Sequence, residues 1–314
     1  MALIKFQLLI LITIAVTACS TARHANDSNW QSGLYGDHPL VGKIWSSATN
    51  EFIESSELLD KASNSRYLLL GEKHDNPDHH ALQALVLDEL VNRNRVSTVA
   101  FEMMNNDSQP RLDTIQEQSL PTLDALKTYL EWDVEGWDWN FYGPLLQSAY
   151  NAGLPIKAAN IDNAMMRQVY GGELPTEISG LLDQVVMDKL NADIDESHCG
   201  MLPESQFPAM VRVQQSRDSA MAAALGLPNS NQVQILIAGN YHVRRDLGVP
   251  NYLLARQSML AATDIMTISF SEVDPETEDP ADYLQQFTDA NAYDYIWFTP
   301  AVSNEDYCAS LRQN

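Results

Sequence analysis

The chain has 314 residues, and its 42 acidic and 19 basic residues give a formal net charge of -23. A charge this negative disfavours nucleic acid and anionic lipid headgroups as partners. It does not define a substrate. Roughly 300 residues are enough to bury one large core, or a core with a smaller subdomain.

The first residues have the pattern of a bacterial lipoprotein signal. Lys5 supplies a positive charge, residues 8–16 are apolar, and residues 16–19 form a small-residue box that ends in Cys19. The apolar stretch is shorter than the about 20 residues of a membrane span, which favours a signal peptide (residues 1–18) over a transmembrane helix. We expect lipidation of Cys19 and anchoring to the outer membrane through the lipid alone, with a flexible tether over residues 19–37.

The rest of the chain alternates short apolar runs with helical patterns. The predicted strands are residues 67–70, 98–101, 156–159, 234–238, 265–270 and 295–298. The predicted helices are residues 77–91, 108–118, 121–130, 143–152, 177–191, 205–225, 250–260 and 279–288. This alternation predicts one α/β domain over residues 38–314, with a mostly parallel central sheet flanked by helices.

Residues 163–232 contain no convincing strand, although they lie between two predicted strands. The segment is far longer than an ordinary crossover connection. We therefore expect an inserted helical lid subdomain on the ligand side of the sheet. Its polar residues would either cover a crevice or only cap and pack the helices.

Two Gly-x-x-His motifs, residues 71–74 and 239–242, follow buried strands. Ligands of open α/β sheets bind beyond the carboxyl ends of such strands. Predicted strand ends carry Glu72 and His74, Glu102, Asn160 and Asp162, and Asn240 and His242. Together they favour a functional crevice, although each group alone could be a helix cap or a structural histidine.

Two further features leave alternatives open. The aromatic residues crowded between positions 132 and 142 form either a plug in the core or an apolar wall for a flat ligand. Cys199 and Cys308 form either a disulfide or two buried thiols in an exported protein.

Familiar catalytic motifs are missing from the sequence: there is no Gly-x-Ser-x-Gly elbow, dinucleotide fingerprint, Walker loop or His-Glu-x-x-His helix. Several other segments occur in a distinctive order between about residues 40 and 260: 71–80, 101–103, 139–144, 198–203, 215–222 and 239–242. Their order resembles the ChaN family of haem-binding lipoproteins. That family shares an α/β core and the paired Gly-x-x-His corners with Tiki proteases, TraB proteins and erythromycin esterases.

The resemblance implies haem binding in the crevice and a role in haem and iron acquisition at the outer membrane. Ferric haem accepts His or Tyr ligands. The candidate haem-binding residues are His74, Tyr142, Tyr170, His198, Tyr241 and His242. A homodimer that holds haem between its subunits, and an outer-membrane haem receptor as partner, are further expectations.

The other branches of the superfamily imply a metal-dependent hydrolase as the alternative. His74 and His242 would hold a divalent metal or orient water, while Glu72 or Glu102 would act as general base. A scaffold with a vestigial crevice is a third hypothesis. The segments outside the shared corners favour haem binding over hydrolysis.

Overall fold

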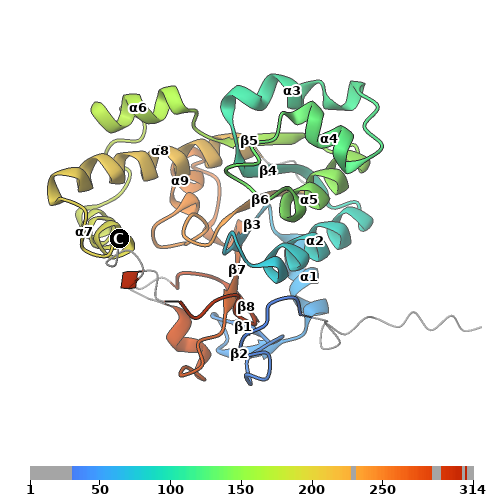
Figure 1. Cartoon of the computed structure of the whole chain (residues 1–314), viewed down its shortest axis with the longest axis horizontal. Helices are drawn as coiled ribbons and strands as arrows, with labels where there is room; N and C mark the ends of the chain where they lie inside the picture. The colour runs from blue at the N-terminus through green and yellow to red at the C-terminus, as the bar shows by residue number, and fades with distance from the viewer. Residues whose placement is uncertain (1–29, 228–230, 285–290, 306–307, 310–314) are drawn as a thin grey trace, which may run out of the picture.

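The computed structural model describes residues 30–227, 231–284, 291–305 and 308–309, so the predicted signal, Cys19 and most of the tether lie outside the described residues. In this part of the chain, eight strands form one sheet in the order β2-β1-β8-β7-β3-β6-β4-β5 (Figure 1). The strands are β1 (Ile44–Ser46), β2 (Glu51–Ile53), β3 (Tyr67–Glu72), β4 (Val96–Asn105), β5 (Ile156–Asn160), β6 (Val233–Gly239), β7 (Ile265–Glu272) and β8 (Tyr295–Thr299). Strands β3 to β8 pair in parallel, whereas β1 is antiparallel to β2 and β8. The predicted α/β class is confirmed.

Helices cover both faces of the sheet. They are α1 (Ser55–Asn64), α2 (Pro77–Asn92), α3 (Gln109–Asp113), α4 (Leu123–Leu130), α5 (Trp139–Asn151), α6 (Asn163–Gly171), α7 (Gln184–Ser197), α8 (Phe207–Leu225) and α9 (Val249–Arg256). Alternate residues of β3 point to opposite faces. Leu68 and Leu70 share one core with α1, α2, α4 and α5, while Tyr67 and Leu69 share the other with α8 and α9. Within the described residues, no helix has the length and apolar character needed to cross a membrane.

The start of α2 illustrates how local sequence determines an element that supports the site. The side-chain oxygen of Asn76 accepts hydrogen bonds from the backbone N–H groups of Asp78 and His79, and Pro77 occupies the first turn. Both features favour a helix N-terminus, because the cap satisfies otherwise unpaired N–H groups. The predicted start of this helix is confirmed.

The structure differs from the sequence-based expectations at several elements. The helix predicted over 108–118 ends at Asp113, where the Thr114 hydroxyl lies 3.3 Å from the Arg111 carbonyl oxygen and competes with helical backbone bonds. The hairpin β1–β2 was not predicted, because strands of three residues carry too little periodicity to detect.

The segment between β5 and β6 contains α6, α7 and α8 and, among its described residues, no strand. Helix α8 packs on the sheet: Met221 and Leu225 are buried in the same core as Leu69 and Leu236. Helices α6 and α7 lie farther from the sheet (Figure 1). A disulfide joins Cys199, just after α7, to Cys308 near the C-terminus, so the disulfide alternative holds.

Candidate functional site

The carboxyl ends of neighbouring parallel strands bring the predicted polar residues together. Strand β6 lies between β3 and β4, and Glu72 at the end of β3 is in register with Gly239 at the end of β6. Glu102 lies on β4, on the other side of β6. The expected convergence of Glu72, His74, Glu102 and His242 therefore follows from the strand order.

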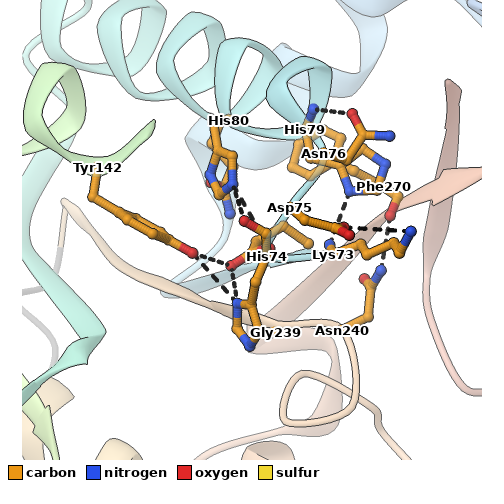
Figure 2. Close-up of polar contacts among 12 residues, drawn as sticks. Lys73, His74, Asp75, Asn76, His79, His80, Tyr142, Gly239, Asn240 and Phe270 are labelled. Atoms are coloured by element: carbon orange, nitrogen blue, oxygen red, sulfur yellow. Dashed lines mark hydrogen bonds and ion pairs between the residues drawn. The ribbon is translucent and has the colours of Figure 1, made fainter. Parts of the chain in front are cut away.

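The first Gly-x-x-His motif, residues 71–74, forms the first corner of the site. There an exposed histidine lies against a buried carboxylate. The His74 Nδ1 lies 2.6 Å from Oε1 of Glu72, whose side chain is fully buried, and the Tyr142 hydroxyl donates to the same oxygen at 3.0 Å (Figure 2). The His74 side chain is 44% exposed. Because Nδ1 donates to Glu72, the His74 ring has one orientation, with Nε2 left for a ligand.

The charges around His74 favour its protonated form. Burial lowers the pKa of His74, but the hydrogen bond and charge of Glu72, helped by the charge of Glu102, outweigh it and raise the pKa. An imidazolium at the rim of a crevice attracts an anionic group.

The second corner is a buried charge cluster. His242 Nδ1 lies 2.5 Å from Asp218 Oδ1, and His242 Nε2 lies 3.3 Å from Glu102 Oε1. The second oxygen of Glu102 accepts the Gly239 N–H at 2.7 Å. Glu102 and His242 were predicted from the sequence as site residues, whereas Asp218 was not; its place on α8 and its acidic side chain were the available signal.

The pKa values in this cluster are strongly shifted. Burial lowers the pKa of His242, but the negative charges of Glu102 and Asp218 outweigh it and raise the pKa to about 10. Burial raises the pKa of Glu102, but the charge and hydrogen bond of His242 outweigh it and lower the pKa to about 2. Burial raises the pKa of Asp218. At neutral pH, His242 is therefore an imidazolium that lies between the carboxyl groups of Glu102 and Asp218.

The two glycines of the Gly-x-x-His motifs each make room for the other motif. A Cβ atom on Gly71 would lie 2.4 Å from Val243 Cγ2 and 3.1 Å from Asn240 Cα. A Cβ atom on Gly239 would lie 3.1 Å from His74 Cε1. The paired glycines thus allow the two corners to lie against each other.

The two histidines expected to hold a metal in the hydrolase alternative, His74 and His242, both contact carboxylates in this arrangement. No group of three or more His, Cys, Asp or Glu side chains within the described residues could hold a metal ion.

The other predicted haem-binding residues lie in different places. Tyr142 is buried, and burial with the charge of Glu72 raises the pKa of its hydroxyl. Tyr241 lines the crevice, but its hydroxyl donates to Asp193 at 2.7 Å. His198 ends α7, where its Nδ1 donates to the Ile194 carbonyl oxygen at 2.7 Å. Tyr170 is 40% exposed on α6 and does not line the crevice.

The aromatic segment lies mainly in the core, as the first of the two alternatives predicts. Trp132, Trp139 and Tyr142 are buried in the core. The Trp137 ring, however, lies edge-on to His74 with ring centroids 4.9 Å apart. The segment is therefore mainly a core plug with one aromatic side chain against the exposed histidine.

The crevice has a volume of about 650 Å³, within the range of small-molecule sites. Its lining includes an acidic wall formed by Glu272, Asp274 and Asp282. This wall was not predicted from the sequence, although Glu272 also follows a predicted strand. Glu272 accepts hydrogen bonds from Lys73 Nζ at 3.0 Å and Asn76 Nδ2 at 2.9 Å, which tie the wall to the first corner.

His79 also lines the crevice but serves the structure. It is fully buried, its Nδ1 accepts the Lys73 N–H at 2.9 Å, and its Nε2 lies 2.9 Å from the Thr299 hydroxyl. Burial, together with the nearby His80 and Lys73, lowers the pKa of His79 well below its ordinary value. Neutral His79 fixes the backbone that carries His74.

Comparison with protein-family models decides the family. The model described as "Haem-binding uptake, Tiki superfamily, ChaN" matches residues 58–253, which include both corners, the aromatic segment and α6 to α8. The chain belongs to the ChaN family. No curated protein is significantly similar to it in sequence.

Solved structures were compared with the chain as well. ChaN of Campylobacter jejuni, described with cofacial heme bound, is 24% identical with a TM-score of 0.66, over 81% of this chain and 95% of that one. This likeness shows the fold. A mutant erythromycin esterase EreC (14% identity, TM-score 0.42, 69% and 72% covered) and the toxin effector domain RRSP from Vibrio vulnificus (14%, 0.40, 69% and 35%) are much weaker likenesses.

Proposed function

We propose that this ChaN-family protein binds haem in the crevice beside His74. The observation that carries the proposal is the exposed His74 ring, which the buried Glu72 holds in one orientation. The Trp137 ring packs against this ring, with the ring centroids 4.9 Å apart. A flat ligand with carboxylate groups suits such a combination of cation and aromatic side chain.

In this proposal, His74 pairs with a haem carboxylate. Its pKa is raised, which favours the imidazolium. The Asp274 and Asp282 carboxylates in the crevice lining repel the carboxylates of haem. The haem carboxylates would therefore lie at His74 rather than beside Asp274 and Asp282.

Tyr170 is our proposed iron ligand. Ferric haem accepts tyrosinate. Burial and neighbouring carboxylates raise the pKa values of Tyr142 and Tyr241, which makes their phenolates costly. Tyr170 is exposed but lies outside the crevice lining of its own subunit. It would reach haem from a second copy of the chain, in a homodimer that covers the open side of the crevice.

Titration with hemin tests this function. The protein used begins at Ser20 and retains every described residue. We expect a saturable shift of the Soret band and a haem-dependent change from monomer to dimer in sedimentation. Tyr170→Phe should change the spectrum, whereas the matched controls Tyr142→Phe and Tyr241→Phe should keep it. A titration without saturable spectral change would refute haem binding.

We further propose that the protein is lipid-anchored to the outer membrane through Cys19 and passes haem to or from a membrane receptor. The N-terminal pattern of residues 1–19 supports the anchor. Labelling with radioactive palmitate should mark the wild type and not Cys19→Ser. Deletion of the gene should slow growth on haem as sole iron source; equal growth would contradict the uptake role.

A further inference from the structure

A small cavity lies beside the haem crevice, between α7 and α8. It has a volume of about 280 Å³. Its lining includes Leu190, Asp193 and Ile194 of α7, Val211 and Gln214 of α8, and Tyr241. Ser197, at the edge of the cavity, is exposed, so the cavity is open to a ligand from solvent.

A ligand in the cavity would contact mainly hydrocarbon side chains. Leu190 and Val211 are almost completely buried. The polar side chains are engaged elsewhere: Asp193 accepts the Tyr241 hydroxyl at 2.7 Å and also pairs with Lys189, and the amide nitrogen of Gln214 lies 3.5 Å from Asp218 Oδ2. Among the described residues, the lining offers a charged ligand no cation, and an anionic ligand would lie against the Asp193 carboxylate.

We propose that this cavity is a second binding site, which takes a neutral apolar group of about ten non-hydrogen atoms. An apolar cavity of about 150 Å³ accepts benzene, so 280 Å³ holds a group the size of two fused aromatic rings. No haem is needed for this site, and the inference goes beyond the function proposed above.

Tyr241 connects the two sites, because its ring lines both the cavity and the crevice. The apolar group therefore has two sources. It is either a separate small molecule or an apolar edge of the ligand that occupies the crevice. Both use the same hydrocarbon contacts with Leu190 and Val211.

The test uses the neutral fluorescent probe 1-naphthylamine, which has the size of two fused rings, with the haem-free protein that begins at Ser20. We expect saturable binding with enhanced fluorescence. Val211→Phe fills the cavity and should weaken binding at least tenfold. Val185→Phe is the matched control: it adds the same ring on α7 at a side chain that is 60% exposed, and should change the affinity less than twofold.

Ser197→Phe provides a second variant if Val211→Phe fails to fold, because Ser197 lies at the exposed edge of the same cavity. Circular dichroism checks the folding of each variant. Absence of saturable probe binding, or unchanged binding in folded Val211→Phe and Ser197→Phe, would overturn the proposal.

Addition of hemin distinguishes the two sources. Displacement of the bound probe, together with weaker hemin binding by Val211→Phe, would assign the cavity to an edge of the crevice ligand. Simultaneous binding of probe and hemin would assign it to a separate molecule. Because the probe is measured without haem, failure of the proposed haem function would leave this result intact.

Discussion

Oε1 of Glu102 lies 3.3 Å from Nε2 of His242, so a carboxylate on β4 and an imidazolium after β6 form a buried ion pair. The sign of each pKa shift determines how this pair contributes to stability. The pKa of His242 is raised to about 10 and that of Glu102 is lowered to about 2. Their ordinary values are about 6.5 and 4.3.

The pair predicts a pH profile for stability. The contribution of His242 is complete below about pH 6.5 and is lost as pH rises through 10. That of Glu102 is complete above about pH 4.3 and is lost as pH falls through 2. Urea unfolding should therefore show a decline in the free energy of unfolding between pH 7 and 10.

His242→Gln should remove most of that alkaline decline and lower the free energy of unfolding at pH 6 by about 3 kcal/mol, because it leaves buried carboxylates without their cation. His198→Gln is the control, since His198 ends α7 outside this cluster. An alkaline decline of equal slope in His242→Gln and wild type would show that His242 is not the titrating group.

The two motif glycines should respond differently to the same added methyl group. In Gly71→Ala, the new Cβ meets Val243 Cγ2 and the Asn240 backbone, so we expect a loss of about 2 kcal/mol in the free energy of unfolding. In Gly239→Ala, the new Cβ meets the half-exposed His74 ring, which can move. This variant should fold with little loss of stability but bind hemin several-fold more weakly.

Gly33→Ala is the control for both variants, because nothing lies within 4 Å of its added Cβ atom. Thermal unfolding and hemin titration of the three proteins provide the comparison. We expect different effects because the added methyl group meets the Asn240 backbone in Gly71→Ala and the His74 side chain in Gly239→Ala. Equal effects of the two variants on stability and on hemin binding would contradict this expectation.

Hemin affinity should depend on the protonation of His74. If the imidazolium pairs with a haem carboxylate, affinity falls as pH rises through the raised pKa of His74. Glu72→Gln removes the charge that raises this pKa, so the fall should shift to lower pH. Titrations from pH 6 to 9 measure both midpoints. A midpoint unchanged in Glu72→Gln would exclude His74 as the titrating group, and His74→Ala should show no such transition.

The disulfide should stabilise the fold substantially. Cys199 and Cys308 are 109 residues apart, and closure of a loop that long in the unfolded chain corresponds to about 5 kcal/mol. The double variant Cys199→Ser, Cys308→Ser should lose roughly that amount in urea unfolding. Thiol titration of the protein that begins at Ser20 should find free thiols only after reduction; free thiols before reduction would contradict the bond.

Local patterns were sufficient to predict the main elements of the fold. Apolar runs such as residues 67–70 and 234–238 indicated buried strands, and Asn76 with Pro77 indicated the start of α2. The short hairpin β1–β2 and the early end of α3 could not be predicted in this way. Tertiary pairing with β8 stabilises β1, and a side-chain hydroxyl after α3 competes with its backbone bonds.

The sequence by itself determined the α/β class, the helical character of the segment before β6 and the residues that follow the strands, because each depends on neighbours along the chain. Only the tertiary structure decided how those residues pair. Asp218 contacts His242, which is 24 residues later in the sequence, and Glu272 contacts Asn76, which is 196 residues earlier. Such pairs depend on strand order and helix packing, which bring distant side chains together and are not encoded in local periodicity.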